Sequence, residues 1–495
     1  MSLNEWQLRA AAQRFPTLAM INGQQVPALS GATFASINPA TGATLAQVAA
    51  CDAADVDVAV AAARQAFEAG VWSQRSPAER KAVLLRLAEL ILLNREELAL
   101  LDSLNMGKPV MDAYNVDVPG AAGVFRWYAE ALDKLYDQVA PSAQNVLATI
   151  TREALGVVAA VVPWNFPLDM AAWKLAPALA AGNSVLLKPA EQSSFSALRL
   201  AELALEAGIP AGVLNVLPGL GEQAGKAMGL HADIDCLAFT GSTEVGKYFM
   251  QYSAQSNLKQ VWLECGGKSA NLVFADCEDL DLAAEKAAFG IFFNQGEVCS
   301  ANSRVLVERS IHDDFVKRLV AKAQGWQPGD PLDPNSSAGA IVETRQTERV
   351  MAYIHGAHEQ GATLACGGQQ LSVNGSSNFI QPTIFTGVTP EMALAQEEVF
   401  GPVLAVIPFD SEEEAVRLAN DSIYGLAASL WTDNLHRAHR VARQLRAGTV
   451  SVNTVDALDV STPFGGGKQS GFGRDLSLHS FDKYTQLKTT WFQLR

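Results

Sequence analysis

The chain has 495 residues, of which 49% are hydrophobic and 18% are charged. These values describe a well-packed globular protein of about two or three domains and exclude a disordered chain. The net charge of −15 argues against nucleic acid and anionic membranes as partners. No apolar run reaches the length of about eighteen residues that suggests a membrane span.

The N-terminus and the cysteines indicate the compartment. Residues 1–16 have the pattern of an amphipathic helix and lack the basic start and apolar core of a secretory signal. The six cysteines show no CxxC spacing, which favours free thiols in a reducing cytosol. His355 and His358 lie three residues apart without further ligand spacing, which favours surface histidines. We therefore expect a cytoplasmic protein that binds no metal.

Helical and strand patterns alternate through the first half of the chain. Apolar residues recur at helical spacing within 55–106. Short apolar runs at 154–162 and 184–188 predict buried parallel strands, with a helix between them that Gly182 closes. The next predicted elements are a helix at 196–208, a strand at 213–219 and a helix at 222–230. This alternation is typical of a doubly wound parallel sheet.

The alternation starts again after residue 265, which predicts a second α/β unit. Its predicted elements are strands at 269–276, 303–309, 363–368, 381–388 and 401–409 and helices at 280–293 and 311–324. Two segments fit neither unit, 135–153 and 481–495, and both have the composition of strands. Alone they would expose unpaired edges and the aromatic residues Trp491 and Phe492, so we expect them to meet a second copy of the chain.

Three side chains that could take part in catalysis lie in distinctive sequence motifs. Cys299 follows the glycine turn of FFNQGEVCSANSR, Glu264 lies in LECGGKSAN, and Asn165 lies in VVPWNFPLDM. A thiol, a carboxylate and a carboxamide can supply the nucleophile, the base and the oxyanion donor of acyl-transfer chemistry. Each also has a structural explanation, because a buried cysteine is commonly inert, Asn165 can end a strand, and Glu264 can cap a turn.

Seven segments, in their order and spacing, resemble the aldehyde dehydrogenase superfamily over almost the whole chain. They are PWNFP at 163–167, GNSVLLKPAEQS at 182–193, FTGSTEVG at 239–246, LECGGKS at 263–269, FNQGEVC at 293–299, EEVFGPV at 397–403 and PFGGGKQSG at 463–471. DVPGAA at 117–122 and RWYAEALDK at 126–134 look most like the aminoaldehyde-oxidising subgroup. That subgroup includes γ-glutamyl-aminobutyraldehyde and 4-guanidinobutyraldehyde dehydrogenases, which suggests polyamine or arginine catabolism.

The resemblance implies oxidation of an aldehyde to a carboxylate with NAD. Cys299 would attack the carbonyl as thiolate, and Asn165 with the Cys299 backbone N–H would stabilise the oxyanion. Glu264 would activate the water that hydrolyses the thioester. Lys174 would support the proton relay or the oxyanion, although a buried structural ammonium explains it too.

The resemblance also divides the chain into functional parts. It implies an NAD-binding domain at 1–134 and 154–262, a catalytic domain at 263–480 and a small β oligomerisation element at 135–153 and 481–495. We expect a homo-oligomer, a dimer of dimers.

The expected cofactor site follows the strands of the first unit. Gly221 and Gly225 belong to a GxGxxxG turn, which departs from the GxGxxG fingerprint and which a tight turn alone would explain. Gly241 and Ser242 open a helix whose bare amides suit a pyrophosphate. By resemblance, the other cofactor residues are Trp164, Lys188, Glu191, Glu398 and Phe400. Glu191 would bind ribose hydroxyls and repel a 2′-phosphate, so we expect NAD to be preferred to NADP.

Two residues depart from the pattern of the superfamily. Cys265 stands beside Glu264 where leucine is common, and this second thiol raises the possibility of oxidative sensitivity. Asp475 stands where many relatives carry glutamate, which shortens any proton relay by one methylene.

The substrate is indicated by acidic residues and by missing arginines. The segments 167–174 and 453–464 contain no arginine, which dehydrogenases of carboxylate-bearing semialdehydes usually present. The residues expected to shape the channel are Asp117, Gly120, Trp127, Asp169, Asp456 and Asp459. The aspartates at the channel mouth would attract a cationic tail, Gly120 would widen the channel, and Trp127 would supply a cation–π wall. Alternatively, the aspartates are ordinary surface charge.

Other functions remain open on the sequence alone. They are a broad-specificity or betaine-type aldehyde dehydrogenase, a CoA-acylating relative, a thiol hydrolase or acyltransferase, and a noncatalytic structural relative. Glu264 argues against the CoA-acylating enzyme, and the lack of a histidine in any motif with Cys299 argues against the hydrolase. Both Cys299 and Glu264 are intact, which argues against a noncatalytic chain.

Overall fold

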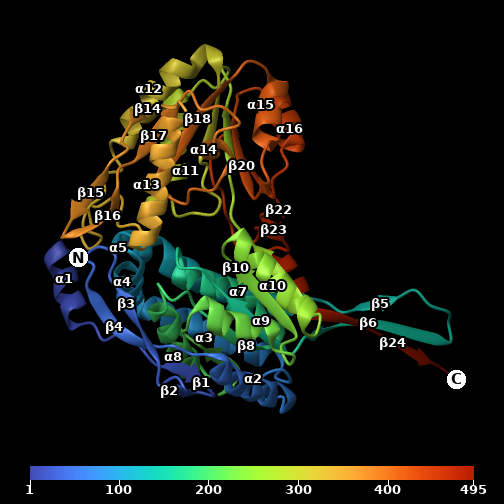
Figure 1. The fold of residues 1–495 in the computed structure, drawn as a ribbon. Coiled ribbons are helices and arrows are strands. Elements are labelled where there is room, and N and C mark those ends of the chain that lie inside the picture. Colours follow the sequence, from blue (N-terminus) through green and yellow to red (C-terminus); the bar gives the residue numbers. More distant parts are fainter. Residues whose placement is uncertain (495) are drawn as a thin grey trace.

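The protein consists of two α/β units and a narrow β arm that extends from the first of them (Figure 1). The structure is a computed structural model that describes residues 1–494. The predicted α/β class with two sheets is confirmed. The N-terminal helix α1 (Leu3–Ala12) begins with a capping box between Ser2 and Glu5.

The first unit is built on a sheet in the order β2-β1-β9-β8-β7-β10-β11-β23. Its strands are β1 (Ala19–Ile21), β2 (Gln24–Val26), β7 (Val157–Val161), β8 (Ser184–Lys188), β9 (Leu214–Val216), β10 (Cys236–Thr240), β11 (Gln260–Glu264) and β23 (Gly471–Phe472). The central strands from β9 to β11 are parallel. Alternate residues face opposite sides, so that Val158 and Ala160 lie in one core and Val157 and Ala159 in another.

Helices cover both faces of this sheet, which explains why its central strands are apolar throughout. On one side pack α3 (Pro77–Leu93), α4 (Arg95–Met106), α6 (Val118–Ala131), α7 (Pro167–Ala181) and α8 (Phe195–Ala207). On the other side pack α2 (Ala53–Glu68), α9 (Lys226–Leu230) and α10 (Thr243–Gln255). Gly182 ends α7 in the left-handed conformation, as predicted. A hairpin of β3 (Thr33–Ile37) and β4 (Thr44–Ala49) precedes α2.

The second unit contains a sheet in the order β14-β17-β18-β13-β12-β20-β21, in which only β14 is antiparallel to its neighbour. The strands are β12 (Ala270–Val273), β13 (Arg304–Glu308), β14 (Thr363–Cys366), β17 (Thr383–Thr386), β18 (Val403–Phe409), β20 (Ala427–Trp431) and β21 (Thr449–Val452). One face is covered by α11 (Leu280–Phe292) and α12 (His312–Ala323), and the other by α13 (Thr344–Glu359), α15 (Glu412–Asn420) and α16 (Leu435–Gln444).

The arm is an antiparallel sheet of β5 (Gln138–Ala140), β6 (Val146–Ala154) and β24 (Thr485–Gln493). It projects away from both units (Figure 1). Trp491 is 66% exposed and Phe492 is 48% exposed, so this chain alone leaves a large apolar surface on the arm uncovered.

Three boundaries differ from the sequence prediction. The strand expected at 154–162 divides at Gly156, whose φ of 132° breaks the run between β6 and β7. Residues 481–483 belong to a 3-10 helix (Leu478–Lys483), so the last strand begins only at Thr485. β23 comes from the range assigned to the second unit, yet it pairs with β11 of the first. A two-residue strand that returns to a distant sheet leaves no periodicity in the sequence.

Candidate active site

A cavity of about 470 Å³ is lined by residues from both units. The start of α7 and the ends of β10 and β11 contribute from the first unit, and the loops around Cys299, Glu398 and Asp456 contribute from the second. The carboxyl ends of parallel strands converge here, which is where doubly wound sheets place their ligands. The cavity therefore brings together the three side chains that the sequence singled out, Cys299, Glu264 and Asn165.

Cys299 is presented by an unusual turn. Asn294, Gln295 and Gly296 all have positive φ, at 49°, 56° and 74°. A Cβ on Gly296 would lie 2.3 Å from the Gly401 backbone, so only glycine fits at this position. Burial raises the pKa of the Cys299 thiol, and the carboxyl groups of Asp456, Glu398 and Glu264 raise it further. The resting side chain is therefore a thiol that needs a base.

Asn165 is held in place from two sides. Its Nδ2 donates to the Glu297 carbonyl at 2.9 Å, and its own carbonyl accepts from Asn294 Nδ2 at 3.0 Å. Both bonds connect Asn165 to the turn that carries Cys299, so they hold the carboxamide next to the segment of the thiol. A carboxamide nitrogen carries two hydrogens, which leaves one free to donate to an oxyanion.

Glu264 is the last residue of β11 and is buried. Neither carboxyl oxygen has a hydrogen-bond partner within residues 1–494. Burial raises its pKa well above the usual value and the charge of Asp475 adds to the rise, while Lys174, Lys483 and Arg474 oppose it. A Cβ on Gly465 would lie 2.6 Å from Glu264 Oε1, so a glycine is needed to make room for the carboxyl group.

Lys174 lies outside the lining of the cavity and is buried in α7. Its Nζ donates to Asp475 Oδ2 at 2.5 Å. Lys483 forms a second ion pair with the other oxygen of Asp475. Asp475 itself lines the cavity. Lys174 thus contacts the cavity only through Asp475. Lys483 was not predicted from the sequence, because it lies in the segment assigned to oligomerisation.

The expected cofactor residues fall into two groups. Trp164, Gly241, Ser242, Glu398 and Phe400 line the cavity, whereas Lys188, Glu191, Gly221 and Gly225 lie outside its lining. In the second group, Lys188 Nζ lies 3.4 Å from Glu191 Oε2. A Cβ on Gly225 would lie 3.5 Å from Lys188 Cδ, so these residues form a connected patch.

Local bonds fix the cofactor residues that line the cavity. Ser242 caps α10 by accepting the Val245 N–H at 3.2 Å. Gly241 and Ser242 both line the cavity, so the N-terminus of the helix borders it. Glu398 Oε1 accepts the Gly267 N–H at 3.0 Å. Burial raises the pKa of Glu398 to about 7.

Asp169 and Asp456 line the cavity, inside it rather than at a mouth. Burial raises the pKa of Asp169 to about 8, and the neighbouring carboxyl of Asp117 adds to the rise. Asp169 Oδ1 has no hydrogen-bond partner. Burial also raises the pKa of Asp456, which a hydrogen bond from Ser300 partly offsets.

The other residues expected at the channel lie elsewhere. Asp117 is 1% exposed and forms an ion pair with Lys108, because a buried carboxylate needs a partner. Asp459 is exposed and caps its own turn by accepting the Ser461 N–H at 2.8 Å. Trp127 packs edge-on against Tyr128, with 4.9 Å between ring centroids. Gly120 is outside the lining too, although a Cβ there would lie 3.2 Å from Asp169 Oδ1.

Sequence reasoning missed the apolar wall of the cavity. This wall consists of Phe166, Met170, Trp173, Phe289, Phe293 and Phe464. Phe166 and Phe293 stack with 6.3 Å between centroids, and Trp173 meets Phe464 edge-on at 5.3 Å. Five of these residues lie in or directly beside α7 and α11 and look like ordinary core positions, and Phe464 lies in a loop, so no local pattern distinguishes them.

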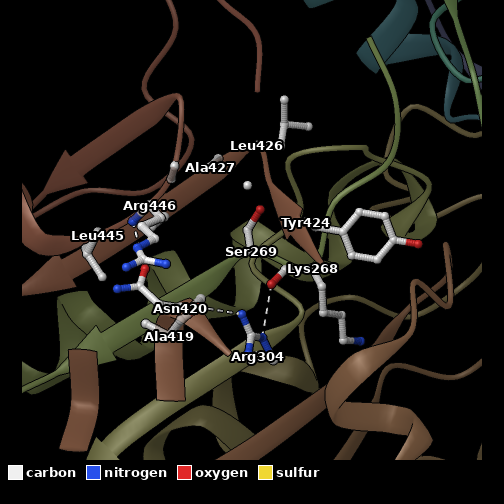
Figure 2. Close-up of a pocket in the computed structure, with 14 residues that line it drawn as sticks. Lys268, Ser269, Arg304, Ala419, Asn420, Tyr424, Leu426, Ala427, Leu445 and Arg446 are labelled. Atoms are coloured by element: carbon white, nitrogen blue, oxygen red, sulfur yellow. Dashed lines mark hydrogen bonds between the residues drawn. The ribbon is translucent and has the colours of Figure 1, made fainter. Parts of the chain in front are cut away.

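A smaller pocket lies in the second unit between β12 and the segment that follows α15 (Figure 2). The Arg304 guanidinium donates to the carbonyls of Lys268, Leu418 and Ala419. These bonds connect the end of α15 to β13, which begins at Arg304. The pocket is therefore a structural contact between elements of the second unit. No helix in residues 1–494 combines the length and the apolar character needed to cross a membrane.

Comparison with known proteins identifies the fold and the class of enzyme. The model of the aldehyde dehydrogenase family matches residues 26–490. The NADP/NAD-dependent aldehyde dehydrogenase PuuC of Escherichia coli (strain K12) is 52% identical over 489 residues, which cover 99% of this chain and 98% of that protein.

Two solved structures agree over their full length. An indole-3-acetaldehyde dehydrogenase complexed with NAD+ is 55% identical, with a TM-score of 0.99 and 100% of each chain covered. The γ-glutamyl-γ-aminobutyraldehyde dehydrogenase of Burkholderia cenocepacia J2315 is also 55% identical, with a TM-score of 0.98 and 100% of each chain covered. The resemblance drawn from the seven motifs is therefore confirmed, and the chain is an enzyme of the aldehyde dehydrogenase family.

Proposed function

We propose that this enzyme oxidises aldehydes with a cationic or strongly polar amino, guanidino or γ-glutamylamino tail to carboxylates, with NAD as oxidant. The observation that carries the substrate class is the pair of carboxyl groups, Asp169 and Asp456, in the wall of the cavity that holds Cys299. The similarity to a γ-glutamyl-γ-aminobutyraldehyde dehydrogenase and to the NADP/NAD-dependent aldehyde dehydrogenase PuuC supports the proposal.

The chemistry begins at the thiol. The Cys299 thiol loses its proton to solvent, and the Sγ atom of the thiolate bonds to the carbonyl carbon while the carbonyl oxygen becomes an oxyanion. The free Asn165 N–H and the Cys299 backbone N–H donate to that oxygen. When bound, NAD accepts the hydride that leaves this carbon. A thioester on Cys299 remains.

Hydrolysis of the thioester restores the enzyme. Glu264 takes a proton from water, and the hydroxide oxygen bonds to the thioester carbon. The carbon–sulfur bond then breaks, so that the carboxylic acid leaves and Cys299 becomes a thiol again once it is protonated. Lys174 supports both steps through Asp475.

The residues present fit NAD. Gly241 and Ser242 offer the open N-terminus of α10 to a pyrophosphate. Lys188 and Glu191 would hold the adenosine ribose beside Gly221, where a side chain would meet open space, and Gly225. Trp164, Glu398 and Phe400 would surround the nicotinamide ribose and ring. Glu191 disfavours a 2′-phosphate, so NAD is preferred and NADP is the weaker cofactor.

We further propose a division of labour along the chain. The part that binds NAD comprises 1–134 and 154–262, the catalytic part is 263–480 with β23 returned to the first sheet, and the arm mediates assembly. The exposed arm supports a homo-oligomer, a dimer of dimers, which light scattering at micromolar concentration would test. A monomer mass would contradict it. The free cysteines and the composition support a cytoplasmic location.

The test of the substrate class is a comparison of NADH formation with five aldehydes. We expect kcat/KM for 4-guanidinobutyraldehyde and γ-glutamyl-aminobutyraldehyde to exceed that for succinic semialdehyde and acetaldehyde by at least about tenfold, or about 1.4 kcal/mol. Indole-3-acetaldehyde is the rival substrate, because the aromatic wall suits a flat ring. A preference for the indole compound that survives Asp169→Asn and Asp456→Asn would contradict a cation-binding cavity.

A further inference from the structure

The carboxyl group of Asp475 is shared by two lysines. Lys174 donates to Oδ2 at 2.5 Å, and Lys483 pairs with Oδ1. All three side chains are no more than 2% exposed. One carboxylate and two ammonium groups leave a surplus of one positive charge. Such a buried charge destabilises the fold unless another anion balances it.

Glu264 is the group whose carboxylate can balance this positive charge. It is buried, and neither oxygen has a hydrogen-bond partner, so neighbouring charges determine its ionisation. The charge of Asp475 opposes the Glu264 carboxylate, and both lysines favour it. If Lys483 were absent, Lys174 and Asp475 would cancel, and Glu264 would face a neutral pair.

Other titratable groups also face this cluster. The side chains around Glu264 and Asp475 are Arg474, Cys236, Cys265, Cys299, Tyr128 and Tyr484. Burial raises the pKa of Cys236 and of Cys265 to about 12, so neither thiol supplies a negative charge at neutral pH. Burial likewise raises the pKa of both tyrosines. Among residues 1–494, Arg474 is the one further cation that acts on the base, and its guanidinium donates to the carbonyls of Gly466 and Gly473.

The position of Lys483 is fixed by the root of the arm. Lys483 ends the 3-10 helix before β24, and its carbonyl accepts from Cys236 Sγ at 3.4 Å. The next carbonyl, of Tyr484, accepts from Asn183 Nδ2 at 2.9 Å. These bonds tie the chain to the first sheet and aim the Lys483 side chain at Asp475.

We propose that Lys483 is a positioning residue for thioester hydrolysis: it holds Asp475 between two ammonium groups and supplies a surplus positive charge that favours the carboxylate form of Glu264. This role rests on the proposed function of Glu264 as the base. It gives the root of the arm a part in turnover in addition to its part in assembly.

Lys483→Met tests the role, because it keeps the bulk of the side chain and removes the charge. We expect the pre-steady-state rate of NADH formation to stay within about threefold of wild type. The steady-state rate at pH 7 should fall about tenfold, and the rising limb of the pH profile should move about one unit to higher pH. Lys483→Arg, which restores the charge, should return the limb to within about 0.3 units.

The matched control is Lys259→Met. Lys259 is also a buried ammonium, bonded to the Gly229 carbonyl at 2.7 Å and to Ser256 Oγ at 2.9 Å. It directly precedes β11, about 16 Å along the strand from Glu264 at 3.2–3.4 Å per residue. Its loss should leave the pH limb in place. If Lys483→Met does not fold, Lys483→Gln, which is neutral but can still donate to Asp475, gives the same readout.

Glu264→Gln separates the two levels of inference. A single fast turnover followed by slow hydrolysis in this variant supports Glu264 as the base. If it is seen and Lys483→Met leaves the pH limb unmoved, the role of Lys483 is overturned while the proposed function stands. If Glu264→Gln keeps the wild-type steady state, the proposed function of Glu264 itself fails, and the role of Lys483 with it.

Discussion

Two buried charge clusters border the cavity, and they have opposite compositions. The Lys108 cluster contains one ammonium and the four carboxyl groups of Asp102, Asp112, Asp117 and Asp169. The Asp475 cluster contains two ammonium groups, those of Lys174 and Lys483, and the two carboxyl groups of Asp475 and Glu264. Each reaches the cavity through carboxyl groups, Asp169 in the first cluster and Glu264 with Asp475 in the second.

The difference shows how the number of ammonium groups determines whether a buried carboxyl keeps its proton. In the Lys108 cluster, burial raises the pKa of Asp102 and of Asp112 to about 7, and one lysine cannot compensate for four carboxyl groups. In the Asp475 cluster, burial alone would raise the pKa of Asp475, but Lys174 and Lys483 outweigh it and hold the value below normal. The Lys108 cluster therefore contains carboxyl groups that keep their protons near neutral pH, whereas the Asp475 cluster keeps Asp475 ionised.

Removal of the thiol between the clusters should have the largest effect. Cys299→Ala should lower kcat by at least about 10⁴-fold, because the variant lacks the sulfur that forms the thioester. NAD affinity, measured by fluorescence titration, should change less than about twofold, since the cofactor residues are untouched. Rapid NADH formation by this variant would show that the nucleophile lies elsewhere.

Removal of the base in the Asp475 cluster should have the next largest effect. Glu264→Gln should slow steady-state turnover by about 10²–10⁴-fold, the usual contribution of general base catalysis. Stopped-flow absorbance should still show one equivalent of NADH per active site. Loss of that first turnover in the same proportion would mean that Glu264 acts before hydride transfer.

The Lys108 cluster should make the preference for a cationic aldehyde depend on pH. A carboxyl group with a pKa of about 8 is mostly neutral at pH 7 and mostly ionised at pH 9. Because only the carboxylate attracts a guanidinium, kcat/KM for 4-guanidinobutyraldehyde should rise about tenfold over this range, relative to an uncharged aldehyde of equal length. Asp169→Asn should remove the relative rise. A ratio that is independent of pH in the wild type would remove Asp169 from tail recognition.

The smallest effect is expected at Asp459, which belongs to neither cluster. Asp459 is exposed, and exposed charge pairs contribute only about 0–1 kcal/mol. Asp459→Asn should therefore change kcat/KM for the same guanidino aldehyde less than about twofold, at low and at high salt. A larger, salt-dependent loss would place the recognition of the tail at the surface.

The sequence predicted the fold and the three central side chains well because both depend on local patterns. Alternating apolar runs indicate the two sheets, one glycine turn precedes Cys299, and another follows Glu264. The Lys108 and Asp475 clusters could not be predicted in this way. Asp117 and Asp459 look alike in the sequence, yet one is buried against Lys108 and the other is solvated.

Lys483 shows the same limit for distant contacts. It lies 309 positions after Lys174, and only the folded chain shows that both reach one carboxyl group. The apolar wall of the cavity was missed for a related reason. Phe289 and Phe293 have the spacing of ordinary helix core residues, and their exposure to a cavity depends on the packing of α7 from the other unit.

Phe464 and Asp475 are joined by a pair of backbone hydrogen bonds, each 2.8 Å long, in which each residue donates to the other. Phe464 belongs to the wall that a substrate tail would touch, and Asp475 belongs to the cluster around the base. For protein engineering, this means that a residue of the substrate wall and a residue beside the base are coupled through the backbone. Libraries that vary Phe464 to admit bulkier aldehydes should therefore be screened for hydrolysis rate as well as for binding, since a shifted backbone at Phe464 displaces Asp475.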